Sequence, residues 1–209
     1  MRILIVDRHA VVRRGVKQTL GEAFGSCEFG EAHDGLEALG LALRRKWDLV
    51  VLAIELDGRS GLEVLAELKR ASPKRRVLVF TRHAKIHYAL RALKAGADGY
   101  VTRDSALEEL VAAVQRVLAG GRYVSSTLAR EMALDLSTRA ERPLHEKLSN
   151  RELEVLRLIG SGMTATQIAA TLALSVKTVS YHRSHLLAKL NLKTTAELIR
   201  CAINDHLVE

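Results

Sequence analysis

Cysteine is scarce in this chain, and the two cysteines present do not form a pattern. Cys27 and Cys201 stand in opposite halves of the 209 residues, with no metal-ligand spacing around either. A disulfide framework and a cysteine-based zinc site both need several cysteines at short spacing, so both are excluded. We interpret the two side chains as buried or incidental thiols rather than as a redox pair.

Long hydrophobic runs are also missing. The opening run from Ile3 to Val6 is far shorter than the apolar region of a secretion signal, and no stretch approaches the length of a membrane span. We therefore expect a cytoplasmic protein without a membrane partner. The chain has only two prolines and is 48% hydrophobic, which is typical of packed domains and not of disorder.

Acidic residues are absent from one long stretch. None occurs from Val155 to Ala196, although the chain as a whole carries 24 acidic and 32 basic residues and a net charge of +8. A surface built from this stretch suits a polyanion such as DNA. Much of the basic excess lies in the N-terminal part, so net charge alone does not locate a binding site. The basic residues of the stretch are Arg157, Lys177, Arg183, Lys189 and Lys193.

The same stretch has the pattern of a helix-turn-helix. Ser149 with Glu152 forms a capping box, and further hydroxyl caps at Thr164 and Ser175 predict two more helices joined by a tight turn. In the third helix, helical spacing places one set of side chains toward the core and another on the outward stripe. The predicted core set is Val176, Val179, Leu186 and Leu190, and the outward set is Lys177, Tyr181 and Ser184 with Ser180 beside them.

The N-terminal half alternates two kinds of pattern. Short apolar runs predict five strands, and leucines at helical spacing, for example Leu36, Leu39 and Leu43, predict helices between them. Such alternation requires crossover connections, and therefore a parallel sheet covered on both faces, with ligands at the carboxyl ends of the strands. The strands are expected at 3–6, 27–32, 49–53, 77–80 and 99–101, and their carboxyl ends at Asp7, Ala53, Thr81 and just before Arg103.

The chain divides into three parts on this interpretation. Residues 1–121 form the α/β domain, 122–147 a linker, and 148–209 the helical domain. Within the linker, hydroxyl caps followed by Leu128 and Met132 predict a helix over 125–136, and 137–147 is expected to be a flexible tether. A last helix is expected within 195–207, where it closes the small core.

The C-terminal part resembles the DNA-binding domain of LuxR-type regulators. The resemblance rests on Arg151-Glu152, Glu154-Val155-Leu156, Gly162, Ile168-Ala169, Leu174-Ser175, Lys177-Thr178-Val179, His182 and Lys189-Leu190. Ala165 and Gln167 stand where the family usually has Asn and Glu. The resemblance implies base contacts by Ser180, Tyr181 and Ser184, phosphate or framework contacts by Thr164, Lys177, Thr178, His182, Arg183 and Lys189, and dimerisation through the last helix.

The N-terminal part resembles the receiver domain of NarL/FixJ response regulators. The resemblance rests on Leu4-Ile5-Val6-Asp7, Trp47-Asp48-Leu49-Val50, Gly58, Ser60-Gly61-Leu62, Thr81 and Ala95-Gly96-Ala97-Asp98-Gly99-Tyr100. It implies a flavodoxin-like five-stranded parallel sheet. In the family, two carboxylates hold Mg²⁺ beside a phosphoacceptor aspartate, and Thr and Lys respond to the phosphate. Here the corresponding residues are Asp7, Arg8, Ala53, Asp57, Thr81, Tyr100 and Arg103, a degenerate pocket.

These residues predict a receiver without phosphorylation. Ala53 has no oxygen to accept a phosphoryl group, and Arg8 places a cation where Mg²⁺ needs a carboxylate. We therefore expect no metal and no cofactor, with Asp7 paired to Arg8 or Arg103 in the pocket. An engineered change could account for Ala53 alone but not for Arg8, Asp57 and Arg103 together. Natural decay of the site is the preferred explanation.

The predicted function is a homodimeric, DNA-binding transcription regulator whose receiver serves dimerisation or a protein partner. The alternative is an antagonist that pairs with an intact regulator and has lost useful DNA contact. The unbroken basic stretch favours the regulator, because sequestering a partner does not require it. An enzyme is not expected, since no nucleophile with a base and no phosphate-cradling glycine loop occurs.

Overall fold

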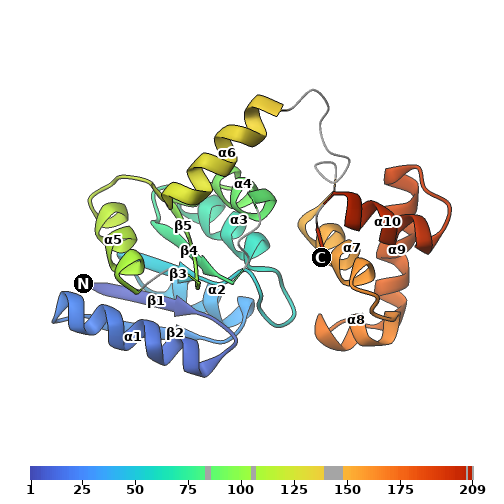
Figure 1. Cartoon of the computed structure of the whole chain (residues 1–209). Helices are drawn as coiled ribbons and strands as arrows, with labels where there is room; N and C mark the ends of the chain where they lie inside the picture. The colour runs from blue at the N-terminus through green and yellow to red at the C-terminus, as the bar shows by residue number, and fades with distance from the viewer. Residues whose placement is uncertain (83–85, 105–106, 139–147, 206, 209) are drawn as a thin grey trace. The chain divides into compact units, whose positions relative to one another are not determined.

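The computed structural model describes residues 1–82, 86–104, 107–138, 148–205 and 207–208. The chain separates into two compact units, Met1–Thr138 and Arg139–Glu209. The first contains a sheet covered by helices, and the second is helical (Figure 1). The expected fold class, an α/β receiver followed by an all-α helix-turn-helix domain, is confirmed.

The first unit is built on a parallel sheet in the order β2-β1-β3-β4-β5-β6. Its central strands are buried along their whole length, as expected for strands covered on both faces. The parallel pairing brings the carboxyl ends of β1, β3, β4 and β5 to one edge of the sheet. The strands are β1 Arg2–Val6, β2 Glu28–Ala32, β3 Leu49–Leu52, β4 Val77–Thr81, β5 Gly99–Thr102 and β6 Tyr123–Val124.

The sheet has one strand more than the five expected from the sequence. In β6, Tyr123 pairs with Gly99 and Val124 with Tyr100. The sixth strand is only two residues long, which is too short to give a periodic hydrophobic signal of its own. The sheet pairing therefore continues beyond residue 121.

Helices cover both faces of the sheet. The helices α1 and α5 contact each other on one face, and α2, α3 and α4 contact one another in turn on the opposite face (Figure 1). One hydrophobic core joins Val16 and Leu20 of α1 and Leu110 and Val114 of α5 to alternate residues of the strands. The bounds are α1 Ala10–Phe24, α2 Gly35–Arg44, α3 Gly61–Ala71, α4 Ile86–Lys94 and α5 Leu107–Leu118.

Two of these helices use their leucines in opposite ways. In α3, Leu62, Leu65 and Leu68 are buried against the sheet. In α2 the small residues Gly35, Ala38 and Ala42 form the buried side instead, and Leu36 and Leu43 are exposed. Of the three leucines that predict helix α2, Leu36 and Leu43 therefore lie on its outer face and Leu39 is half-buried.

The helix α6, Ser126–Thr138, follows the sheet and contacts α4. It begins within one residue and ends within two of the helix expected over 125–136, and its Leu128 is buried. The tether expected after it falls mainly on 139–147, which lie outside the described residues.

The second unit has four helices in its described part, and three of them begin with a complete capping box. In these boxes a hydroxyl accepts from the third backbone amide of the helix, and the third side chain accepts from the cap amide. The three pairs are Ser149 with Glu152, Thr164 with Gln167, and Thr194 with Glu197. The helices are α7 Asn150–Gly160, α8 Ala165–Thr171, α9 Val176–Leu190 and α10 Thr195–Asn204.

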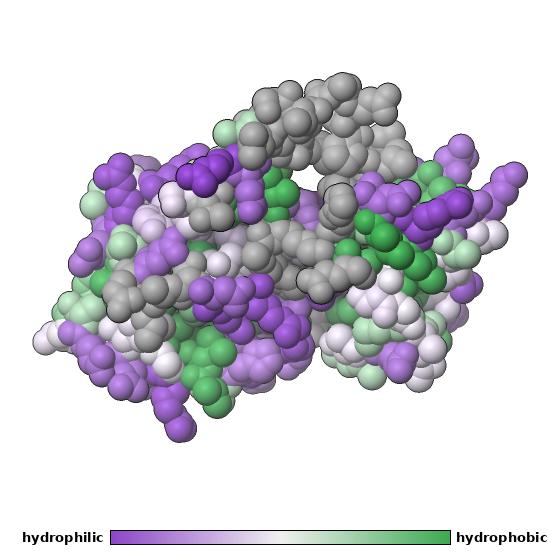
Figure 2. Space-filling view, viewed as in Figure 1, coloured by the Kyte–Doolittle hydropathy of each residue, from purple (hydrophilic) through white to green (hydrophobic). Residues whose placement is uncertain are grey.

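No helix in the described part of the chain is long and apolar enough to cross a membrane. On the face shown in Figure 2, hydrophobic colour is confined to patches separated by hydrophilic side chains. Cys27 and Cys201 are both free thiols and half-buried. Burial, reinforced by the neighbouring carboxylate of Asp205, raises the pKa of the Cys201 thiol, and this lowers its reactivity at neutral pH.

Candidate DNA-binding surface and receiver pocket

The helix α9 is the second helix of the helix-turn-helix. It begins after Ser175, whose side chain accepts a hydrogen bond of 3.0 Å from the amide of Thr178, and it ends at Asn191 in the left-handed conformation. Val179, Leu186 and Leu190 are buried, as expected. The expectation was wrong for Val176, which is 44% exposed because the first turn of α9 extends beyond the packed core.

The outward stripe of α9 carries the predicted base-facing residues. Tyr181 and Ser184 are exposed, and Ser180 is half-buried. The hydroxyl of Ser184 donates to the carbonyl oxygen of Ser180 at 3.1 Å, so this proton is already used within the helix. Ser184 therefore presents acceptor lone pairs to a partner, and Tyr181 is the one aromatic side chain of this stripe.

The ring of Tyr181 is supported by two histidines. Its centroid lies 4.2 Å from that of His185 at a tilt of 36°, and 5.8 Å from that of His182 in an edge-on arrangement. Tyr181 is 59% exposed, and the part of its ring that is covered packs against these two rings. His185 was not singled out from the sequence, although its spacing of four residues from Tyr181 on a helix could have indicated the contact.

Other predicted contacts surround this stripe. Lys177 and Arg183 are exposed on α9, and Thr178 and His182 are half-buried. Thr164 caps α8: its hydroxyl donates to Gln167 Oε1 at 2.9 Å and accepts from the Gln167 amide at 3.3 Å. The glutamine that replaces the family's usual residue at position 167 therefore still completes the cap.

Lys189 is exposed like the other cations of α9, but it also forms an ion pair within the unit. Its Nζ lies 2.7 Å from Glu152 Oε2, and the same carboxylate oxygen accepts from the amide of Ser149 at 2.8 Å. Burial acts to raise the pKa of Glu152, but the hydrogen bonds from Lys189 and Ser149 outweigh it and leave the pKa below its usual value. Lys189 thus joins α9 to the capping box of α7.

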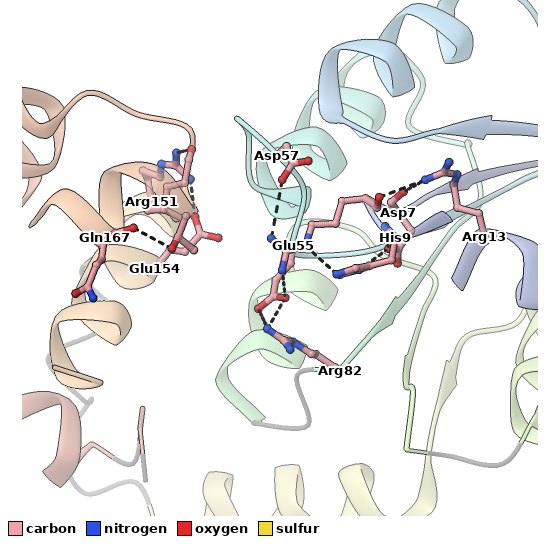
Figure 3. Close-up of polar contacts among 12 residues, drawn as sticks. Asp7, His9, Arg13, Glu55, Asp57, Arg82, Arg151, Glu154 and Gln167 are labelled. Carbon is pink, nitrogen blue, oxygen red and sulfur yellow. Dashed lines mark hydrogen bonds and ion pairs between the residues drawn. The ribbon is translucent and has the colours of Figure 1, made fainter. Parts of the chain in front are cut away.

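At the carboxyl edge of the receiver sheet, Asp7 is surrounded by its own chain. The buried carboxylate accepts from Arg103 Nη2, and its Oδ1 accepts from the backbone amide of His9 at 2.8 Å. The His9 ring lies 3.2 Å from the same oxygen, and Arg13 donates to the Asp7 carbonyl at 2.8 Å (Figure 3). Of the two partners that the sequence allowed for Asp7, the structure pairs it with Arg103.

Arg8 is directed toward the other acidic groups of this edge. It lies 3.6 Å from Glu55 and 3.9 Å from Asp57, and Arg82 approaches Glu55 to 2.9 Å (Figure 3). The sequence had not singled out His9, Arg13 or Arg82. Their roles depend on how the loops after β1, β3 and β4 meet, which no local pattern encodes.

The remaining positions of the pocket are buried. Ala53 presents a methyl group at the phosphoacceptor position, and Thr81 lies at the end of β4. Tyr100 is fully buried in β5, and burial raises the pKa of its phenol far above the ordinary value. In this conformation the residue at the switch position is directed into the protein interior.

The residues at this edge do not fit a Mg²⁺ site. The one carboxylate of the family pair that is retained, Asp7, is paired with Arg103, and Arg8 brings a second cation. Mg²⁺ needs near-octahedral oxygen coordination with carboxylates, which this cationic surrounding opposes. Among the residues that the structure describes, no three His, Cys, Asp or Glu side chains gather as a candidate metal-binding group.

Comparison with known proteins agrees with the two-part fold. Residues 3–115 match the response regulator receiver domain, and residues 146–202 match the luxR family of bacterial regulatory proteins. The chain therefore belongs to the response regulators that join a receiver to a LuxR-type helix-turn-helix. Its family consists of transcription regulators, and the chain is a transcription regulator of the response-regulator type with a LuxR-type DNA-binding domain.

Relatives match this chain over nearly its whole length. BvgA of Bordetella pertussis is 38% identical over 206 residues, which are 99% of this chain and 98% of the relative. The oxygen regulatory protein NreC of Staphylococcus epidermidis is 34% identical over 217 residues, covering both chains fully. A crystal structure of a LuxR-family two-component response regulator from an Aurantimonas species shares 37% identity, with a TM-score of 0.63, over 65% of this chain and 97% of that one.

Proposed function

We propose that this regulator binds double-stranded DNA as a homodimer in the cytoplasm without phosphorylation of its receiver. The observation that carries the proposal is the pocket itself, where Ala53 replaces the nucleophile and Arg103 is paired with Asp7. The division into a receiver (1–121), a linker (122–147) and a DNA-binding domain (148–209) is part of the proposal.

The physical argument concerns the two things that phosphoryl transfer requires. A receiver needs a carboxylate nucleophile and a divalent cation that neutralises the charge of the transferring group. Ala53 cannot be the nucleophile, and the cations of Arg8 and Arg103 occupy the surroundings of Asp7. These fixed ion pairs would hold one receiver conformation, so that activity follows protein abundance or a protein partner bound to the receiver.

The DNA contacts are proposed by position on α9 and α8. Ser180, Tyr181 and Ser184 would approach base edges, and Lys177, Thr178, His182 and Arg183 phosphates. Thr164 and Lys189, which serve a cap and an ion pair, would act mainly as framework. None of the base-facing residues is Arg, Asn or Gln, so readout would combine contact of Tyr181 with thymine methyl groups and DNA shape. Two half-sites about ten base pairs apart suit the dimer.

The experiment that tests the proposal uses acetyl phosphate with Mg²⁺. The intact chain should gain no phosphoryl mass, and its DNA affinity should be the same before and after incubation. A stoichiometric adduct accompanied by tighter DNA binding would contradict it. A receiver that retains the aspartate nucleophile and both metal-binding carboxylates, treated in parallel, controls for donor activity.

A second candidate function is an antagonist that pairs with an intact regulator. It is favoured by the weak base-reading set of α9 and by Ala165 at the start of α8. The exposed cations Lys177 and Arg183 argue against it. If the chain showed no affinity for any duplex even at low salt, where phosphate contacts are strongest, the antagonist would become the better description.

A further inference from the structure

The outer face of α2 is an apolar stripe that the first unit does not use. Leu36 and Leu43 are 71% and 70% exposed, and they lie seven residues apart, on the same side of the helix. The buried side of α2 consists of Gly35, Ala38 and Ala42, so the two large side chains contribute little to the receiver core. Exposed leucines in register on one helix are a surface suited to another helix.

Gly40 lies on the same face, between the two leucines. A Cβ placed on Gly40 would meet nothing within 4 Å, so no close contact inside the unit requires glycine there. Glycine within a helix costs about 1 kcal/mol relative to alanine. Its use here leaves a shallow site between two leucines, where the backbone of a second helix can approach closely.

The charges on α2 are opposite at its two ends. The N-terminal end carries Asp34 as its cap and Glu37 in its first turn, and Arg44 lies in the last turn with Arg45 and Lys46 after it. Arg45 already pairs with Glu28 and lies over the ring of Trp47. Arg44 is exposed and has no ion pair within the described structure.

We propose that this face of α2, defined by Leu36, Gly40 and Leu43, docks against the same face of a second copy of the chain. A two-fold axis passing near Gly40 makes the two helices antiparallel. It places Leu36 of one copy beside Leu43 of the other, and Glu37 opposite Arg44 in both halves of the interface. A parallel arrangement would instead place the Glu37 and Arg44 flanks of the two copies on opposite sides of the interface, so that no Glu37–Arg44 pair could form. The charges therefore select the antiparallel pair.

The contact would be weak in solution and stronger on DNA. One ten-residue helix per copy cannot bury the roughly 1,200 Å² of a stable complex, so dimers form only at high protein concentration. Two copies held on adjacent half-sites experience an effective concentration of about a millimolar, at which a weak contact suffices. This inference rests on the proposed homodimer and identifies α2 as one of the surfaces through which its two copies contact each other.

Cysteine cross-linking gives the first test, and the chain supplies a matched control. Gly40→Cys would bring the thiols of two copies together across the axis. Gly15→Cys changes the middle of α1, where a Cβ is equally unobstructed, on the opposite face of the sheet. Under mild oxidation, Gly40→Cys should give disulfide-linked dimers in clear excess over Gly15→Cys and over the unchanged chain with Cys27 and Cys201. Equal yields would contradict the proposal.

Sedimentation over a range of protein concentrations gives the second test. Leu43→Glu should weaken self-association roughly tenfold or more, because it removes a buried leucine from both halves of the interface. Val11→Glu is the control, since Val11 is 82% exposed on α1 and lies outside the proposed face. If Leu43→Glu formed dimers as readily as the unchanged chain, the dimer would form through another face. That result would contradict the α2 contact but not the proposed homodimer. If the unchanged chain stayed monomeric at every concentration, the α2 contact would be ruled out in solution while DNA binding remained testable.

A charge exchange separates antiparallel docking from a nonspecific contact. Arg44→Glu should weaken association about two- to fivefold, since it faces Glu37 of the other copy. Adding Glu37→Arg should restore the lost association. Because the Glu37 carboxylate also accepts from the His33 amide, helix content is measured for both variants. Failure of the second change to restore association in a folded protein would contradict the antiparallel arrangement.

Discussion

The ammonium group of Lys189 and the carboxylate of Glu152 lie 2.7 Å apart, which joins the end of α9 to the beginning of α7. The carboxylate side chain is only 6% exposed, so its charge depends on this partner and on the Ser149 amide. Of the two roles that the sequence allowed for Lys189, phosphate or framework contact, the ion pair supports the framework role.

Lys189→Ala is therefore expected to lower stability more than it lowers intrinsic DNA affinity. It removes the cation from a buried carboxylate, at a cost of about 1–3 kcal/mol in the free energy of unfolding. The unfolding temperature of the second unit measures this loss of stability. Lys177→Ala is the control, since Lys177 is exposed and should affect DNA binding and not stability. An unfolding temperature unchanged by Lys189→Ala would show that the ion pair contributes nothing.

Acid should destabilise the helical unit through Glu152. The hydrogen bonds from Lys189 and Ser149 keep the pKa of Glu152 below its usual value of 4.5, so its ionised form is stabilised by folding. The contribution is fully present above that usual value and is lost as pH falls through the lower, folded pKa. Urea unfolding between pH 6 and about 3 measures this dependence. The free energy of unfolding should fall less steeply with decreasing pH in Glu152→Gln than in the unchanged chain. Equal slopes in the two proteins would mean that groups other than Glu152 cause the acid effect.

Arg103→Ala should destabilise the receiver far more than Arg8→Ala does. Asp7 is buried and would lose its cation, which costs about 2–4 kcal/mol. Arg8 reaches Glu55 and Asp57 only at 3.6 and 3.9 Å near the surface, so its loss should cost under about 1 kcal/mol. Denaturant titration of the two variants gives the comparison. Similar losses would mean that the Arg103 pair does not organise the pocket.

Restoring phosphorylation should require more than a new nucleophile. Ala53→Asp alone is expected to stay unmodified by acetyl phosphate, because Arg8 opposes the metal ion. The double change with Arg8→Asp is the smallest expected to give an adduct. Adding Arg103→Lys should raise its yield, since Arg103 no longer competes for Asp7. Mass spectrometry follows the adduct, and its appearance with Ala53→Asp alone would overturn the argument from the cations.

Tyr181→Ala should change the preference among DNA sequences, and His185→Ala should partly reproduce this change. The His185 ring packs against the Tyr181 ring at a tilt of 36° with the centroids 4.2 Å apart, so we expect its removal to leave the tyrosine present but less well oriented. His185→Phe should retain the preference because the stacking surface remains. Binding selection from a random pool compares the three variants. An unchanged preference in Tyr181→Ala would remove this residue from base readout.

The helical unit was the part most completely predicted from the sequence. The cap at Ser149 with Glu152 and the caps at Thr164 and Ser175 are local signals, and the structure has helices beginning after each. The prediction that Val176 is buried was wrong. The spacing of apolar residues gives their direction around the helix axis, but it does not show at which residue of the helix the contact with the core begins. The partner of Lys189 lies 37 residues away, a distance that no local pattern spans.

In the receiver, the sequence predicted the alternation of strands and helices, and comparison by position identified Asp7, Ala53 and Arg103. The sequence could not predict which arginine pairs with which carboxylate. Arg8 and Arg103 approach Asp7, Glu55 and Asp57 only when the loops that follow the strands come together in the fold. The sequence also left open which side of α2 is buried. Alanine and glycine can line a closely packed face as well as leucine can, and helical spacing alone does not distinguish the two sides.

Both edge strands of the sheet, β2 and β6, have features that hinder the addition of a strand from another chain. The strand β6 is only Tyr123–Val124, so it offers few unpaired backbone groups. The strand at the other edge, β2, carries two exposed glutamates, Glu28 and Glu31, and Glu31 pairs with Arg13. Short or charged edges prevent another chain from adding a strand. Both edges of this sheet therefore disfavour the addition of a strand from a second copy. The α2 contact proposed above uses side chains on a helix, and its two-fold arrangement closes at two copies.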